Sequence, residues 1–189
     1  MADQTPLPVI TAWAWVARCV VASARLLAKR RVRLSRTHVG QYLRFADGTT
    51  SRVYRETVVD RSPSSDPAVL VVGFRLRLVR GRGHDLFRYE SLLNTPLFVG
   101  FPGFISKLWL ANDEHGLYRG LYQWDGAGQA EHYARALWRV LALVSVPGSI
   151  RYRVLPGLLR EDLLSNPQLV PADESGTWWR LTAVPAPVP

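Results

Sequence analysis

Apolar residues follow a helical pattern near the start of the chain. Between residues 9 and 29 they recur at about 100° per residue, which predicts an amphipathic helix. The span includes arginines and therefore lacks the about 20 unbroken apolar residues of a membrane crossing. One face of the helix would hold Val9, Trp13, Val16, Val20 and Leu27, and the opposite face Thr11, Arg18, Arg25 and Lys29.

Two strand-like stretches, residues 41–45 and 51–59, follow the helix and enclose a tight turn. The turn contains Asp47 and Gly48, a pair that supplies the positive φ angle of a hairpin turn. Residues 62–67 then read Ser-Pro-Ser-Ser-Asp-Pro, a composition typical of linkers. We therefore expect an N-terminal extension over residues 1–66, made of the helix, the hairpin and the linker.

The middle of the chain alternates between strand and helix patterns. Strands are predicted at residues 70–79, 104–111, 117–124 and 150–155, and helices at residues 85–94 and 129–144. This β-α-β-β-α-β order predicts the α+β class and a ferredoxin-like domain, in which a four-stranded antiparallel sheet carries two helices on one face. The domain would span residues 67–157, and an acidic and then proline-rich extension would follow over residues 158–189.

Alternation along the predicted strands sorts their side chains into two faces of the sheet. In the first strand Leu70 and Phe74 share one face, which we expect to lie under the helices. The same rule places Ser106, Leu108 and Leu110 of the second strand on that face. The result is either an aromatic core or an aromatic pocket for a small ligand. The predicted substrate-binding residues are Phe98, Phe101, Ser106, Tyr118, Tyr122, Trp124 and Tyr152.

The opposite face of the predicted sheet is rich in cations. An unpaired buried charge is costly, so this face is exposed to water, covered by acidic groups, or used to bind an anion. We expect the two extensions to fold over the sheet or over a dimer seam and to supply the acids. The cations are Arg75, Arg77, Lys107, Arg119, Arg151 and Arg153, and the available acids are Glu56, Asp60, Glu161, Asp162, Asp173 and Glu174.

Composition and charge narrow the class of protein. The 189 residues are 48% hydrophobic and carry a formal net charge of +9, which excludes disordered tails and fibrous repeats. The single cysteine, Cys19, cannot form a disulfide within one chain and fits a reducing compartment. Positive charge follows the apolar run of the first helix rather than preceding it, which disfavours a signal peptide. We therefore expect a cytoplasmic protein.

Basic residues are concentrated on the first helix and directly after it. Such a density suits the helix for docking on its own domain, on an anionic membrane surface as a peripheral contact, or on nucleic acid. Nucleic acid is disfavoured because the chain has neither zinc-finger spacing nor an RNP-like aromatic motif. The candidate anion- or partner-binding residues are Arg18, Arg25, Lys29, Arg30, Arg31, Arg33, Arg75 and Arg77.

Several classes of chemistry lack their sequence signals. The histidines lie far apart, no HExxH pattern occurs, and one cysteine cannot begin a zinc cluster, so no metal is expected. Nucleophile elbows and glycine-rich phosphate loops are absent from the sequence, which disfavours hydrolases, kinases and Rossmann enzymes. His132 lies away from the apolar stripe of its helix and should be solvated, which disfavours a haem ligand. We therefore expect no cofactor.

Two motifs resemble a known family. The run from Phe101 to Trp109, FPGFISKLW, the run from Gly120 to Trp124, GLYQW, and the alanine-rich helix behind them are similar to the antibiotic-biosynthesis-monooxygenase-like superfamily of dimeric α/β barrels. The likeness is greatest to its branch of small monooxygenase-like proteins and covers about residues 70–157. It implies a homodimer and a substrate cavity between the helices and the sheet. Several members of the family oxidise aromatic substrates without a cofactor, and others degrade haem.

Two functions follow from these observations. The first is binding of a small aromatic or apolar molecule, with cofactor-independent monooxygenase-like catalysis as its enzymatic form. No general base is identifiable from the sequence for that form. The alternative is a non-catalytic binding or scaffold protein that docks on a membrane surface or an acidic partner through its basic N-terminal helix.

Overall fold

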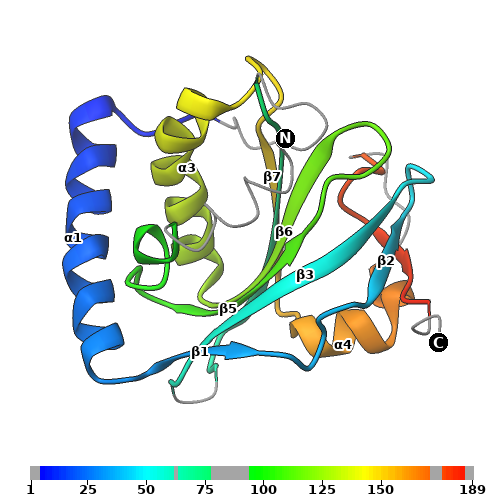
Figure 1. Ribbon diagram of the computed structural model, residues 1–189, viewed down its shortest axis with the longest axis horizontal. Coiled ribbons are helices and arrows are strands. Elements are labelled where there is room, and N and C mark those ends of the chain that lie inside the picture. Colours follow the sequence, from blue (N-terminus) through cyan, green and yellow to red (C-terminus); the bar gives the residue numbers. More distant parts are fainter. Residues whose placement is uncertain (1–4, 62–63, 78–93, 171–175, 186–189) are drawn as a thin grey trace.

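One curled antiparallel sheet of eight strands organises the molecule, and helices pack on both of its faces (Figure 1). The computed structural model describes residues 5–61, 64–77, 94–170 and 176–185. The α+β class predicted from the sequence is confirmed. The expected helix at residues 85–94 lies, apart from Asn94, outside the described residues.

Helices and strands are interspersed along the described chain, and a helix comes first. The helices are α1 (Val9–Ala28), η1 (Thr95–Leu97), α3 (Ala127–Val144), α4 (Arg160–Ser165) and η2 (Pro167–Leu169). The strands are β1 (Val32–Ser35), β2 (Tyr42–Phe45), β3 (Thr50–Val59), β4 (Pro67–Arg75), β5 (Phe104–Leu110), β6 (Leu117–Asp125), β7 (Arg151–Pro156) and β8 (Leu181–Ala183).

The sheet extends well beyond the four strands expected from the sequence. Its order is β7-β4-β6-β5-β3-β2-β8, and β1 pairs with β3 off this path. The predicted hairpin forms between β2 and β3, with Gly48 at a φ of +84° in its turn. Strand β3 also pairs with β5, for example Arg55 opposite Trp109. The expected four-stranded sheet is therefore wrong, because the hairpin and β8 add to the same sheet.

Each face of the sheet buries its own apolar cluster. Alternate residues of β4 divide between them, since Leu70 packs under the helices with Trp124 and Tyr133, whereas Val69 packs on the other side with Trp179. Helix α3 packs on the first face, and α1 lies outside it, against α3 and η1 (Figure 1), whereas α4 and the indoles of Trp178 and Trp179 in the C-terminal extension cover the second. The extension therefore folds over the sheet of its own chain.

An irregularity in β5 reverses the predicted facing of that strand. The pairing of β5 with β6 shifts between Phe104 and Ser106, so one extra residue enters β5 at this point. A one-residue shift moves every following side chain to the other face. Ser106 and Leu108 therefore face the second cluster, contrary to the expectation, and Lys107 and Trp109 face the helices.

Helix α1 packs on the domain through a different face from the one expected. Its buried residues are Ala12, Val16, Cys19 and Ser23, and Ser23 Oγ donates to the carbonyl oxygen of Pro96 at 2.8 Å. A Cβ on Gly100 would collide with the backbone oxygen of Cys19, so small residues allow this close approach. The expected apolar face is mostly exposed, because the small residues fit against η1 and the segment that follows it.

Candidate functional site

Lys107 is the most unusual side chain of the helix-covered face. It is 6% exposed, and its Nζ atom lies 3.1 Å from the centroid of the Trp109 ring. The rings of Tyr122 and Phe98 lie 4.7 and 4.8 Å from the same nitrogen. Lysine is almost never fully buried unless it is paired. Lys107 is therefore buried among aromatic rings with no acidic partner among the described residues, an environment that a purely structural role does not explain.

A second cation, Arg55, enters the same group of rings from β3. It is 7% exposed, and its guanidinium carbon lies 3.9 Å from the centroid of the Trp109 ring. Its Nη2 atom donates to the hydroxyl of Thr95 at 3.4 Å, whereas Nε and Nη1 are buried without a hydrogen-bond partner among the described residues. Buried polar atoms are nearly always hydrogen-bonded, so two unpaired guanidinium nitrogens indicate a missing acceptor.

The electrostatics of this pair are dominated by burial and like charge. Burial, and after it the charge of Arg55, lowers the pKa of Lys107 well below its ordinary value. Burial also lowers the pKa of Arg55, to about 10, so Arg55 remains a cation at neutral pH. The ion pairs within the described residues all join other groups, and none supplies a carboxylate to Lys107 or Arg55.

Two kinds of chemistry suit this arrangement. An anion placed between the two side chains would satisfy the free donors of Arg55 and offset the repulsion between the cations. In addition, the burial that lowers the pKa of Lys107 favours its neutral amine, the form that can act as a general base or a nucleophile. Tyr122 adds a protonated hydroxyl, because burial raises the pKa of its phenol.

The predicted substrate-binding residues divide into three groups. Phe98 and Tyr122 lie against Lys107. Phe101 and Trp124 pack further along the same face, around Tyr133, at ring distances of 5.1 and 4.8 Å. The structure does not bring the remaining three into this group: Tyr118 stacks on Phe74, Tyr152 lies beside Trp138, and Ser106 is on the opposite face of the sheet.

The sequence predictions missed Arg55, Lys107, Trp109 and Tyr133 as members of this group. Simple strand parity assigned Lys107 and Trp109 to the other face, since it could not account for the extra residue in β5. One available signal was the position of Lys107 inside an otherwise apolar strand. A buried cation in such a run is a reason to expect a function.

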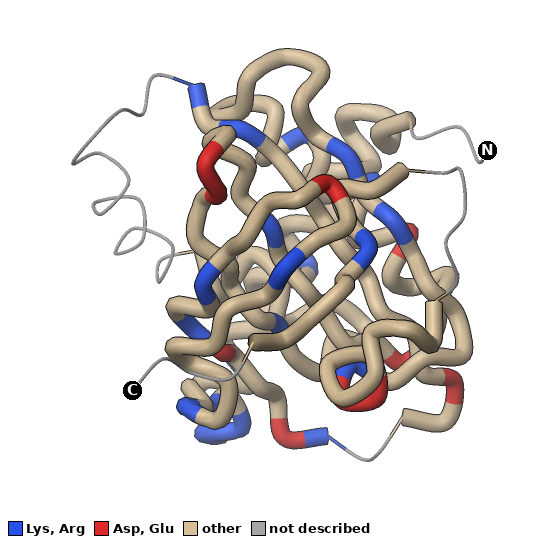
Figure 2. Tube along the Cα trace, turned by 90° about the vertical axis from the view of Figure 1, so that its right-hand side faces the viewer, with Lys and Arg blue, Asp and Glu red and all other residues tan. Residues whose placement is uncertain are grey.

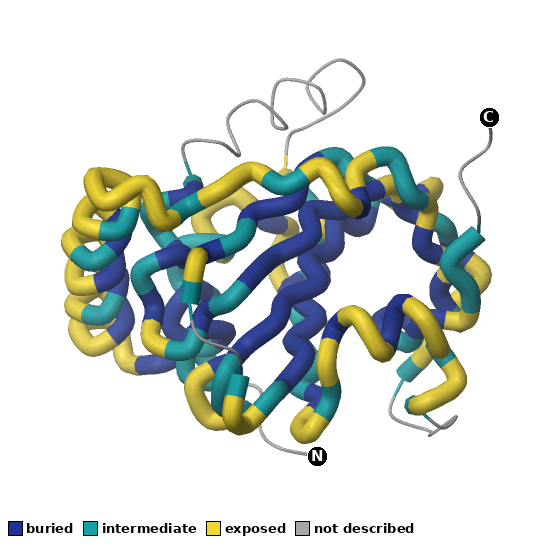
Figure 3. Tube along the Cα trace, turned by 90° about the horizontal axis from the view of Figure 1, so that it is seen from below, coloured by how far each residue is buried: buried dark blue, intermediate teal, exposed yellow. Residues whose placement is uncertain are grey.

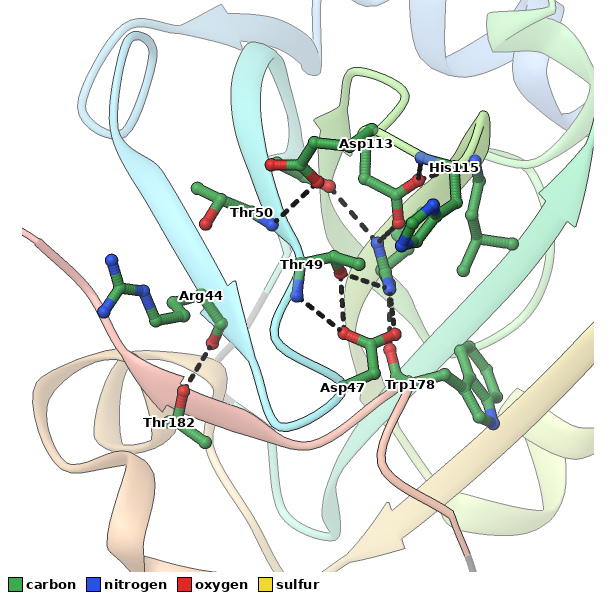
Figure 4. Close-up of polar contacts among 12 residues, drawn as sticks. Arg44, Asp47, Thr49, Thr50, Asp113, His115, Trp178 and Thr182 are labelled. Atoms are coloured by element: carbon green, nitrogen blue, oxygen red, sulfur yellow. Dashed lines mark hydrogen bonds and ion pairs between the residues drawn. The ribbon is translucent and has the colours of Figure 1, made fainter.

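Arg119 is also buried but, unlike Arg55, has a hydrogen-bond partner for each of its three guanidinium nitrogens. Its Nε atom donates to the Trp178 carbonyl at 2.8 Å, and its Nη atoms contact Asp113, Asp47, Thr49 and Ser51. Figure 4 shows Asp47, Thr49, Asp113 and Trp178 converging from the hairpin, the loop before β6 and the C-terminal extension. This cluster joins three distant segments and is structural.

The acids that pair with Arg119 on the second sheet face differ from those expected, whereas two of the expected acids, Glu56 and Glu161, pair with Arg160. Asp47 and Asp113 pair with Arg119, whereas Asp173 and Glu174 lie outside the described residues. Indole rings of the C-terminal extension cover two further cations of this face, with Trp178 over Arg151 at 4.7 Å and Trp179 over Arg153 at 5.1 Å. Viewed from the side of β2 and α4, Figure 2 shows basic and acidic residues interspersed along the chain.

His38, Glu56 and Glu161 form a third polar cluster, with potential ligand atoms within 4.8 Å of one another. Both ring nitrogens of His38 are already bonded, Nδ1 to Glu56 and Nε2 to Glu161, each at 3.1 Å. Arg160 Nη2 contacts the same two carboxylates at 2.7 and 2.6 Å. Two cations therefore balance two acids, and no imidazole nitrogen of His38 is free for a metal ion.

The predicted anion-binding residues all lie on the surface. Arg18 and Arg25 are exposed on α1, and Lys29, Arg30 and Arg31 are exposed directly after it. Arg33 is exposed on β1 and lies 3.9 Å from Asp60, and Arg75 and Arg77 are exposed at the end of β4. The predicted anion-binding residues are therefore exposed, in contrast to the buried Lys107 and Arg55.

His132 is half-buried rather than solvated, contrary to the expectation. The indole of Trp15 on α1 packs edge-on against its ring, with centroids 4.5 Å apart. Burial lowers the pKa of His132, and its Nε2 atom is buried without a hydrogen-bond partner. The expectation was wrong because α1 covers the face of α3 that the sequence pattern leaves polar.

Comparison with known proteins gives one weak likeness. No protein-family model and no curated protein sequence matches the chain. Among solved structures, an anthrone oxidase-like protein matches with 16% sequence identity and a TM-score of 0.38. The match covers 57% of this chain and 54% of that protein, so the chain spans about half the length of the protein that it resembles.

Proposed function

We propose that the protein binds a small aromatic or apolar molecule that carries a carboxylate or an acidic hydroxyl, with Arg55 and Lys107 as its anion-binding pair. The observation that carries this proposal is the pair of unpaired guanidinium nitrogens on Arg55, buried beside a second cation. An anionic ligand supplies the missing acceptor and the missing negative charge in one step.

The aromatic rings define the other half of the ligand. Trp109, Phe98 and Tyr122 surround the Lys107 amine and belong to one buried cluster. Flat rings pack well against such side chains in offset or edge-on contacts. A ligand with an aromatic body and an anionic end fits both parts, whereas a purely polar anion would leave the rings unused.

In the enzymatic form of the proposal, Lys107 acts as the general base that the sequence did not identify. In its neutral form, which burial favours, the amine would accept a proton from an activated methylene group, and Arg55 would stabilise the resulting enolate. Dioxygen is the oxidant: both C–H bonds of the methylene break, one oxygen atom forms the new carbonyl group, and the other leaves as water with the two hydrogens. Such chemistry requires no cofactor, as in the family that the sequence resembles. The homodimer and the cytoplasmic location stay predictions.

The binding proposal is tested by calorimetry with two probes that share a ring system. We expect 2-naphthoate to bind at least about tenfold more tightly than the uncharged 2-naphthylmethanol, because only the former offers a carboxylate to Arg55. Lys107→Met and Arg55→Met should each remove this difference. Lys29→Met, which changes the other lysine of the chain at an exposed position, should not.

Two outcomes would contradict the binding proposal. One is equal affinity of the intact protein for both probes, including no binding of either. The other is a preference for 2-naphthoate that remains in both Lys107→Met and Arg55→Met, because the carboxylate would then bind elsewhere.

A further inference from the structure

The outer side of α1 carries a row of exposed apolar residues. Ile10 is 85% exposed, and Trp13, Val20, Val21 and Leu27 are each between 39% and 53% exposed. Figure 3 shows α1 at the edge of the molecule, with its exposed residues directed outward and its buried residues toward the domain. At about 1.5 Å per residue the row from Ile10 to Leu27 extends roughly 25 Å, and exposed apolar patches of such length are typical of docking surfaces.

Positive charge borders this apolar row and continues past its end. Arg18 and Arg25 are exposed along one edge of α1, and the helix contains no acidic residue. A basic segment follows immediately, with exposed Lys29, Arg30, Arg31, Arg33 and Arg36. A helix with an apolar face and adjacent lysines and arginines has the composition of an interfacial membrane helix.

The contacts between α1 and the domain limit the ways in which the helix can bind a bilayer. By length and composition alone, α1 could cross a membrane. However, Ser23 and Cys19 contact the Pro96 carbonyl, and the Leu7 amide donates to the Arg135 carbonyl at 3.1 Å. Crossing a bilayer would break these contacts and expose the cluster beneath α1. The helix can instead lie in the plane of a membrane while it remains docked.

Two other occupants of this surface fit less well. A second copy of the chain, packed through the same face, would cover the apolar row but would offer the basic segment no acidic partner from α1, which contains no acidic residue. Nucleic acid would neutralise the arginines but would leave the apolar row without a partner. An anionic bilayer satisfies both features, because its acyl boundary accepts apolar side chains and its phosphates accept arginines.

We propose that the outer face of α1 and the basic segment after it bind peripherally to an anionic membrane surface. The helix lies parallel to the bilayer, with Ile10, Trp13 and Val21 in the boundary between headgroups and acyl chains. The arginines contact lipid phosphates. The sheet and the Lys107 group lie on the other side of α1 (Figure 1), so this surface does not depend on the proposed ligand.

The experiment is co-sedimentation of the full chain with vesicles of phosphatidylcholine, with and without phosphatidylglycerol. We expect binding only to the anionic vesicles, and its loss at high salt. The double variant Ile10→Ser/Val21→Ser should bind at least about tenfold more weakly, since it removes the apolar contact. The matched control Leu159→Ser/Leu169→Ser alters two apolar residues that are exposed elsewhere and should bind like the intact protein.

A charge series tests the basic segment separately. Lys29→Gln/Arg30→Gly should weaken binding by about tenfold or more. Arg30 has a φ of +53°, a conformation that glycine adopts readily, so the variant is expected to fold. Arg44→Gln/Arg52→Gln, two exposed arginines of the hairpin, is the control. Three results would overturn the proposal: equal binding to neutral vesicles, equal losses in the control variants, or self-association through α1 without vesicle binding.

Discussion

The Nζ atom of Lys107 lies 3.1 Å from the centroid of the Trp109 ring, and the guanidinium carbon of Arg55 lies 3.9 Å from the same centroid. One indole thus contacts two buried basic side chains. Each cation–π contact is worth about 2 kcal/mol when it is desolvated, less than the several kcal/mol that burial of an uncompensated charge costs. Arg55 and Lys107 therefore destabilise the fold locally, and proteins retain such destabilising groups at functional sites.

Replacing Lys107 by an apolar residue of similar length should leave the fold intact or strengthen it. Lys107→Met removes the amine and its repulsion with Arg55 and keeps most of the packing, so we expect the free energy of unfolding to be unchanged or raised by about 1–2 kcal/mol. Urea denaturation provides the measurement. A loss of more than about 2 kcal/mol would mean that the lysine stabilises the core.

The effect of Lys107→Met should also depend on pH in a defined direction. The folded state lowers the pKa of Lys107 below its ordinary value of 10.5, so the unfolded chain binds a proton that the folded chain does not. The lysine therefore costs more stability as the pH falls from 10.5 toward its folded pKa. The difference in unfolding free energy between variant and intact protein should grow as the pH falls. A constant difference would contradict burial of the amine.

For His38 we predict that the stability of the fold depends on pH in the opposite direction. The hydrogen bonds that His38 donates to the carboxylates of Glu161 and Glu56 raise its pKa to about 9 from an ordinary 6.5. The stabilisation is complete below pH 6.5 and is lost as the pH rises through 9. It amounts to no more than about 3 kcal/mol. His38→Gln should lower the melting temperature at about pH 6 and have little effect at about pH 10, and equal losses at both would refute the interpretation.

Arg119 should be among the most sensitive positions for stability. Arg119→Met leaves the Asp113 carboxylate buried without its cation and removes the donors that join the hairpin to the C-terminal extension. The expected loss is about 3–5 kcal/mol in the free energy of unfolding. Arg151→Met, a half-buried arginine over Trp178, serves as the control and should cost less than about 1 kcal/mol.

Truncation after Val170 tests whether the C-terminal extension covers the sheet. The shortened chain would lack Trp178 and Trp179, which bury the second face of the sheet, as well as the carbonyl that accepts from Arg119. We expect a lower melting temperature and increased binding of a hydrophobic dye. A truncated chain as stable as the full chain would show that the extension is dispensable.

Local sequence patterns predicted the elements but not how they face one another. The helix predicted over residues 9–29 matches α1, and the hairpin predicted around Asp47 and Gly48 matches β2 and β3. The face that α1 buries could not be predicted, because the closest contact depends on the absence of a side chain at Gly100. A hydrophobic pattern favours the largest residues, whereas this interface selects small ones.

The composition of the candidate site depends on one extra residue in β5, which the hydrophobic periodicity of the sequence does not reveal. The extra residue in β5 places Lys107 among the aromatic rings and moves Ser106 away from them. Phe98 and Tyr122 were predicted as binding residues, since the former lies on an irregular segment and the latter on a regular strand. Arg55 becomes a neighbour only because β3 pairs with β5, which extends the sheet beyond its predicted edge.

The most direct test of the account is an NMR titration of the lysine side chains. The chain has two lysines, Lys29 and Lys107, so labelling of lysine gives two Cε resonances that Lys107→Met assigns. We predict that Lys107 titrates well below the ordinary lysine value of 10.5 and that 2-naphthoate raises its pKa, since a bound carboxylate stabilises the ammonium. Titration of Lys107 near pH 10.5, with no change on adding naphthoate, would contradict its assignment as part of an anion-binding site.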